Sequence, residues 1–184
     1  MNRSMLAAAI LAVGFAAPAF AENTVMVGGM AMYPSKNIVQ NAVNSKDHTT
    51  LVAAVKAAGL VPTLESPGPF TVFAPTNEAF AALPAGTVET LLKPESKPTL
   101  TKVLTYHVVP GTHDSAAIRA AIAAGGGKAT MKTVEGDMLT FMLNGANNIA
   151  VTDSKGNTAD IVVYDVTQSN GMIFSIDKVL MPAS

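Results

Sequence analysis

The sequence predicts a β-rich α+β protein in which several short helices precede a run of strands. In the first half of the chain, apolar residues recur at helical spacing, as at Leu51, Val52, Val55 and Ala58. From Lys128 onward, strand-like runs alternate with turn signals that contain Gly or Asn, a pattern typical of hairpins. A third observation is the strand-like run 70–74, which stops at Pro75 and leads into a helix start.

The N-terminal part is expected to be helical after a short leader. Residues 22–34 are predicted to be an irregular leader that contains Met and Gly. Ser35 is placed to cap a first helix. A second helix is expected to start between Asp47 and Thr49 and to end at Gly59, because Gly suits the left-handed residue that follows a helix. Helices this short depend on tertiary contacts.

The run 70–74 alternates β-branched and aromatic residues, which predicts a strand covered on both faces. Pro75 has no N–H and ends the strand pairing. Thr76 suits the N-cap of the next helix, Glu78 favours its dipole, and Phe80 is expected to anchor that helix by packing. We therefore expect an architectural corner here and no catalytic one.

Further helices are predicted at 87–92 and 97–105, followed by an alanine-rich helix that begins at Asp114 or Ser115 and ends in three glycines. The C-terminal half is predicted to be an antiparallel meander. Together with 70–74, we count about seven strands, the others being 106–109, 129–134, 138–143, 149–152, 160–166 and 172–176.

Three segments in chain order resemble the signatures of one family. Residues 71–80 (TVFAPTNEAF), 104–111 (LTYHVVPG) and 169–182 (SNGMIFSIDKVLMP) are similar to the first box, the Tyr-His segment and the second box of the fasciclin (FAS1) domain. The resemblance covers roughly Ser35 to Pro182. It implies the FAS1 fold, a sandwich-like, antiparallel or mixed β-wedge of about seven strands with several short helices packed on one side.

The N-terminus predicts export. Arg3, an apolar stretch from Met5 to Phe15 and the small residues Ala19 and Ala21 follow the order of a secretory signal peptide. We expect residues 1–21 to be removed by cleavage after Ala21, leaving the leader 22–34 and a single FAS1 domain, 35–184. The mature protein is expected to be secreted or periplasmic, with no membrane span.

Composition argues against several kinds of partner. The chain has 12 Lys and Arg, 13 Asp and Glu, no Cys and no Trp, and its basic residues are spread singly. Nucleic-acid binding is therefore not expected, because it needs a basic patch. The lack of a basic amphipathic face likewise argues against a membrane-surface role.

The sequence carries no recognisable catalytic motif. Gly-x-Ser-x-Gly elbows, phosphate loops and dinucleotide fingerprints are absent. None of the three histidines has another at the spacing of a local metal pair. His107 is expected to be a structural histidine, and His48 and His113 to be surface residues. We predict a protein that is not an enzyme and binds no cofactor.

Methionine is the one unusual chemical signal. Met26, Met30 and Met32 cluster in the leader, and thioethers are soft ligands that suit Cu(I). The alternative is that these side chains fill gaps on the domain surface.

The resemblance also implies a partner-binding site. In animal members, an aspartate-containing motif upstream of the second box and the Tyr-His segment contact integrins. The matching positions here are Asp165 with Val166 and Tyr106 with His107. Asp165 also follows an apolar run, so the second interpretation is a carboxylate bound to backbone donors at a strand end.

These observations predict an exported FAS1-domain protein that makes adhesive or other protein–protein or cell–matrix contacts at the cell surface or envelope. The alternative function is a small-ligand or Cu(I)-binding envelope protein. It would use the methionine-containing leader or a pocket between the helices and the wedge.

Overall fold

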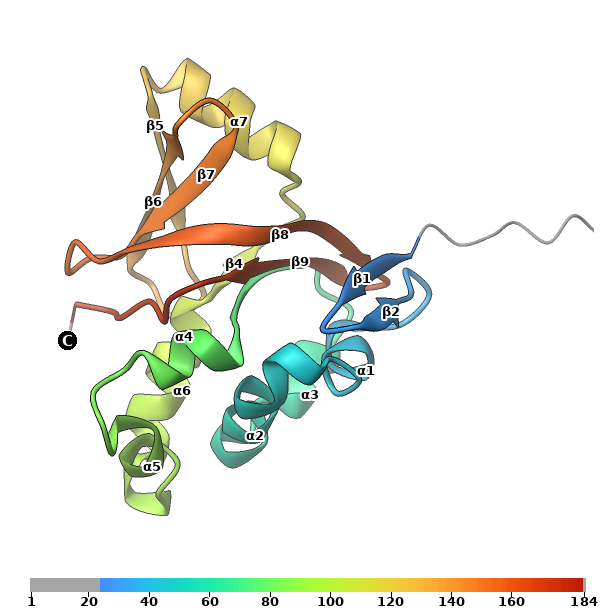
Figure 1. Cartoon of the computed structure of the whole chain (residues 1–184), viewed down its shortest axis with the longest axis vertical. Coiled ribbons are helices and arrows are strands. Elements are labelled where there is room, and N and C mark those ends of the chain that lie inside the picture. Colours follow the sequence, from blue (N-terminus) through green and yellow to red (C-terminus); the bar gives the residue numbers. More distant parts are fainter. Residues whose placement is uncertain (1–23, 184) are drawn as a thin grey trace, which may run out of the picture.

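The computed structural model describes residues 24–183 (Figure 1). The predicted signal peptide lies outside this range. The strands are β1 (Val25–Val27), β2 (Met30–Met32), β3 (Phe70–Pro75), β4 (Val108–Pro110), β5 (Lys128–Lys132), β6 (Met138–Asn144), β7 (Asn148–Thr152), β8 (Thr158–Gln168) and β9 (Gly171–Ile176). The α-helices are α1 (Ile38–Ala42), α2 (Thr49–Ala58), α3 (Val61–Glu65), α4 (Asn77–Ala81), α5 (Thr87–Leu91), α6 (Lys97–Tyr106) and α7 (Ser115–Ala124). Two 3₁₀ turns complete the list, η1 (Lys46–His48) and η2 (Pro94–Ser96).

Seven of these strands form one mixed sheet. Their order is β4-β3-β9-β8-β7-β6-β5, in which β3 and β9 run parallel and all other neighbours are antiparallel. Just beyond β5, the amide of Val134 donates to the carbonyl of Val108 in β4 at 2.7 Å, so the two edges of the sheet approach each other. The sheet is a nearly closed wedge, which confirms the predicted fold class and the C-terminal meander.

The central strands separate two hydrophobic cores. In β3, Val72 and Ala74 face one core, whereas Phe73 between them faces the other. In β9, Ile173 belongs to the first core and Phe174 to the second. Successive side chains of a strand point to opposite faces, so a continuous apolar run fits a strand that is buried on both sides.

The helices divide between these two cores. Residues of α2 and α6 pack in the first core, and Figure 1 shows α1 to α6 gathered at one end of the molecule. Helix α7 instead contributes Ile118 and Ile122 to the second core, alongside β5 and β6. Most of the helices thus cover one side, as expected, and α7 covers the other. In the described part of the chain, every helix is too short or too polar to cross a bilayer.

The two signature boxes meet at the centre of the sheet. Strand β3 of the first box pairs in parallel with β9 of the second, and Phe73 lies opposite Phe174. Their rings stack with centroids 5.5 Å apart and an interplanar angle of 14°. The second box also binds helices α1 and α3 through the buried side chain of Asn170. This side chain accepts a hydrogen bond from the Ile38 amide of α1 at 3.0 Å and donates one to the Leu64 carbonyl of α3 at 2.8 Å.

Three local expectations need correction. The leader is not irregular: Val25–Val27 and Met30–Met32 form a hairpin, since the two glycines between them adopt positive φ and close a tight turn. The N-cap of α1 is Asn37 and not Ser35, because Asn37 forms a reciprocal capping box with Gln40. The structure also contains the short helix α3 directly after α2, where the sequence analysis places no helix.

Candidate functional site

Tyr106 lies at the end of α6 and is fully buried. Its hydroxyl donates to the carbonyl of Met138 at 3.0 Å and accepts from the amide of Ser154 at 2.9 Å. These bonds tie the helix to the start of β6 and to the turn that follows β7. Tyr106 therefore holds the wedge together and offers no surface to a partner.

His107, the next residue, is also buried and has both ring nitrogens engaged. Nδ1 lies 2.8 Å from the carbonyl of Val103, and Nε2 lies 3.0 Å from the amide nitrogen of Leu180. A carbonyl only accepts and an amide N–H only donates, so His107 carries its proton on Nδ1. Burial lowers the pKa of His107 to about 4, against smaller raising effects of the Val103 carbonyl and Asp153. His107 is thus the structural histidine that the sequence predicts.

Asp165 lies at a bulge in β8 with a left-handed backbone, φ +54°. Its carboxylate accepts from the amide of Ser115 at 2.7 Å and from the Ser115 hydroxyl. Ser115 begins α7, so the charge lies at the positive end of that helix. Asp165 is half-buried, whereas Val166 beside it is buried. The backbone-binding interpretation of Asp165 accounts for these contacts.

The structure does not bring the Tyr-His segment and the Asp165 motif together. The segment leads into β4, the motif lies in β8, and β3 and β9 separate these two strands. Three strand spacings of about 4.8 Å place β4 and β8 roughly 14 Å apart in the sheet. Of the four residues that the resemblance marks, Asp165 alone is accessible in the folded domain.

The three leader methionines do not share a face either. Met26 is 60% exposed, whereas Met32 is 3% exposed and packs in the first core. In the hairpin register Met26 pairs with Ala31, and Met30 and Met32 lie opposite Val27 and Val25. Residues on one face of a two-stranded ribbon alternate, so Met26 points away from the side that carries Met30 and Met32. Across residues 24–183, no three His, Cys, Asp or Glu side chains are grouped as a metal site.

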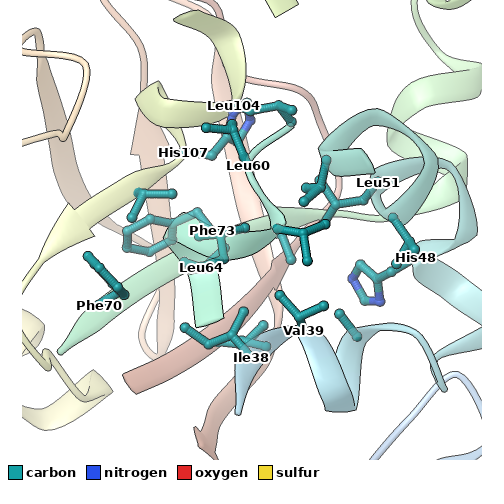
Figure 2. A pocket seen from close by; sticks show the side chains of 18 of the residues that line it. Ile38, Val39, His48, Leu51, Leu60, Leu64, Phe70, Phe73, Leu104 and His107 are labelled. Carbon is teal, nitrogen blue, oxygen red and sulfur yellow. The ribbon is translucent and has the colours of Figure 1, made fainter. Parts of the chain in front are cut away.

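An apolar cavity lies between α1, α2 and α3 and the facing side of β3 (Figure 2). This cavity has a volume of about 80 Å³ and a lining that is almost entirely aliphatic and aromatic. His48 lies in its wall, 3% exposed, with Nδ1 2.8 Å from the hydroxyl of Ser45. Nε2 of His48 is enclosed by its neighbours and makes no hydrogen bond of good geometry. Burial lowers the pKa of His48, and a hydrogen bond with the Ala74 backbone and the charge of Asp47 offset this only in part.

The prediction that His48 is a surface residue was wrong. His48 occupies the N-cap position of α2 but does not cap it. Asn77 of the first box does so instead, since its side-chain oxygen accepts from the Thr50 amide at 3.0 Å. The imidazole is thereby free to turn inward. A signal was present in the sequence, because His48 lies three and seven residues before Leu51 and Val55 and extends the apolar stripe of that helix.

Ser45 and His48 form a contact that resembles a nucleophile with its base. A catalytic pair also needs a third group that orients the base and a path for the substrate to the hydroxyl. Here Nε2 of His48 meets no carboxylate, and Ser45 is buried. The geometry of this pair does not favour acyl transfer.

Fold and site together define a β-wedge domain with a small apolar cavity. The family model of the fasciclin domain matches residues 46–182. The chain belongs to the fasciclin domain family. This confirms the resemblance of the signature boxes.

Two relatives of the chain are bacterial proteins. It is 45% identical over 161 residues to protein sll1483 of Synechocystis sp., a match that covers 88% of this chain and 82% of the relative. It is 36% identical over 161 residues to the cell surface glycolipoprotein MPB83 of Mycobacterium bovis, covering 85% of this chain and 64% of that protein.

A solved structure has the same fold. It is a FAS1 domain pair from the insect cell adhesion molecule fasciclin I, which superposes with a TM-score of 0.70 over 81% of this chain at 15% identity. The chain spans about half of that solved chain, 52% of its length.

Proposed function

We propose that the protein is an exported FAS1 interaction module that makes adhesive protein–protein or cell–matrix contacts at the cell surface or envelope and catalyses no reaction. Support comes from the family membership, from a structural relative described as a cell adhesion molecule and from a sequence relative described as a cell surface protein. A fold alone does not define a function, so the site must carry the argument.

The observation that carries the proposal is that the polar side chains of the signature segments form structural hydrogen bonds. Tyr106, His107 and Asp165 each hydrogen-bond to a distant part of the backbone. Their side chains stabilise the fold and are not free to activate a substrate. The outer surface of the domain is therefore the part available for function, as expected for a protein that acts by binding other molecules.

The partner surface is proposed to lie at the corner formed by Asp165 and the start of α7. Asp165 is the accessible member of the four residues that the family resemblance marks, and Tyr106, His107 and Val166 are buried. Exposed Ala116 follows Ser115 on the same helix turn and gives a way to block the corner. Substitution there leaves the Asp165–Ser115 hydrogen bonds in place.

The experiment compares two exposed helical alanines. Ala116→Arg places a bulky side chain at the proposed corner, and Ala57→Arg places the same side chain on α2 as the matched control. Chemical crosslinking in envelope extract of the source cells, followed by mass spectrometry, measures partner recovery. We expect the unmodified protein and Ala57→Arg to recover the same protein and Ala116→Arg to lose it. Equal recovery by both variants would place the contact elsewhere.

A further inference from the structure

The apolar cavity between the helices and β3 is long and narrow. Phe70, Val72 and Ala74, which lie on the same face of β3, all line it. Because a strand rises about 3.3 Å per residue, these side chains extend over roughly 13 Å. The cavity volume is only about 80 Å³, roughly half of the ~150 Å³ of an apolar protein cavity that binds benzene. The space therefore suits a single hydrocarbon chain better than a ring.

The wall of the cavity exposes almost only hydrocarbon. Figure 2 shows Val39, Leu51 and Leu64 directed into the same space. The imidazoles in the wall offer no free polar atom, because Nε2 of His48 is enclosed and both ring nitrogens of His107 are hydrogen-bonded. A buried water usually makes about two to four hydrogen bonds, which this wall does not supply. The cavity thus favours an aliphatic group over water.

The cavity reaches the surface where α2 meets α3, and cations border this opening. Lys56 of α2 and Thr63 of α3 belong to the lining and are exposed. The Lys97 ammonium of α6 lies beside Gly59, which joins the two helices. Within residues 24–183, no acidic side chain lines the cavity and no ion pair engages Lys56. An anionic group at this opening would meet a positive charge and keep its contact with water.

We propose that the cavity binds a short, unbranched fatty acid, whose chain lies against Val39, Leu51 and Leu64 and whose carboxylate stays in solvent beside Lys56. A neutral hydrocarbon would fill the same space but gain nothing from Lys56, and a cationic chain would be repelled by it. The opening lies between α2 and α3 and not at the corner of Asp165 and α7, so this inference does not depend on the adhesive function.

The test uses the exported protein and three probes, hexanoate, hexylammonium and benzoate. The readout is the methyl ¹H–¹³C spectrum, in which Val39, Leu51 and Leu64 report on the cavity and the exposed Leu143 is the control. We expect hexanoate to shift the three cavity signals saturably and to leave Leu143 unchanged. It should bind about fivefold more tightly than hexylammonium, as an exposed charge pair allows. Benzoate has the same charge but a ring, and it should not shift the cavity signals.

Chain length tests the apolar part of the site. From butanoate to hexanoate, the affinity should rise about fourfold for each added methylene, because each methylene that enters the cavity leaves water. In Val39→Phe, which fills the cavity, this rise should disappear. An affinity that does not change along the series for the unmodified protein would contradict the proposal.

Two charge-reversing variants test the role of Lys56. Lys128 is an exposed lysine of β5 outside the lining, so Lys128→Glu is the matched control for Lys56→Glu. Lys56→Glu should remove the preference for hexanoate over hexylammonium, and Lys128→Glu should keep it. Lys56 also lies in the last turn of α2, where a cation stabilises the helix, but comparing two probes on one variant cancels that effect.

These surface variants keep the test decisive if Val39→Phe does not fold. Equal affinities of hexanoate and hexylammonium for the unmodified protein would overturn the proposal. So would signals of Val39, Leu51 and Leu64 that do not change up to the solubility of hexanoate.

Discussion

Nε2 of His107 accepts a hydrogen bond from the amide of Leu180 at 3.0 Å, four residues beyond the end of β9. Two further contacts hold the same C-terminal segment, from the amide of Met181 to Asp153 at 2.9 Å and from the amide of Ala183 to Asp137 at 3.1 Å. The imidazole of His107 therefore joins the Tyr-His segment to the backbone of the second box. This arrangement explains why a histidine is buried here and why it must be neutral.

The first prediction concerns pH. The folded-state pKa of His107 is lowered to about 4, from about 6.5 in an unfolded chain. Between these values the unfolded state binds more protons, so the free energy of unfolding should fall as the pH falls from 7 to 4, by about 3 kcal/mol from His107. His48, whose pKa burial also lowers, acts in the same direction. Denaturant unfolding at a series of pH values measures this loss.

A matched pair of variants tests whether His107 causes the pH dependence of stability. His107→Gln removes the titrating group and should reduce the slope of stability against pH. His113→Gln, at the half-buried histidine outside both cores, should leave the His107 contribution intact. A wild-type stability that does not change between pH 7 and 4 would contradict the prediction.

Phe80 should be an anchor of the fold. Its side chain is 6% exposed in the first core, on the helix that Thr76 caps. Phe80→Ala should lower the free energy of unfolding by roughly 3–5 kcal/mol through the cavity it leaves. Leu143→Ala, at a residue 47% exposed, is the control and should change stability by less than about 0.5 kcal/mol. Thermal or denaturant unfolding distinguishes them, and a loss below about 1 kcal/mol for Phe80→Ala would be at odds with the packing.

Asp165 should contribute to stability more than to recognition. Asp165→Asn keeps a residue that tolerates the left-handed backbone but removes the charge at the start of α7. We expect the free energy of unfolding to fall by about 1–2 kcal/mol and partner binding to fall only in proportion. Melting temperature and partner affinity are measured together. Weaker binding at an unchanged melting temperature would instead identify Asp165 as a contact residue.

Copper binding by the leader is not expected. Met26 lies on the opposite face of the hairpin from Met30 and Met32, so the three sulfur atoms do not form one site. Titration with Cu(I) should show no binding at micromolar concentrations. Tight binding that is lost when all three methionines are replaced by leucine would support the alternative, because leucine keeps most of the volume and removes the thioethers.

Export can be measured directly. If the signal peptide is cleaved after Ala21, the exported protein begins at Glu22, since Ala19 and Ala21 supply the small residues before the cut. Intact-mass measurement of the exported protein should give a chain of residues 22–184. A protein that starts at Met1 and remains in the membrane fraction would mean that the segment serves as an anchor.

Local patterns were sufficient for much of the architecture. Thr76 caps α4, Gly59 ends α2 in the left-handed conformation, and Asp114 caps α7, each as its residue type predicts. The alternation in 70–74 indicated a strand covered on both faces, and the structure confirms it. These features depend on neighbours within a few residues, so the sequence contains the information directly.

The chain by itself thus determined the strands of the seven-stranded sheet, several helix ends, the family and the structural role of His107. The tertiary structure alone decided the orientation of His48, because Asn77, 29 positions later, caps α2 in its place. It also decided that the Tyr-His segment and Asp165 lie apart, because β3 and β9 separate β4, which follows the segment, from β8. Helix capping and hydrophobic periodicity depend on residues close in the sequence. The burial of a polar side chain and the distance between two sites depend instead on which strands and helices become neighbours. The packing of the two cores determines those neighbours.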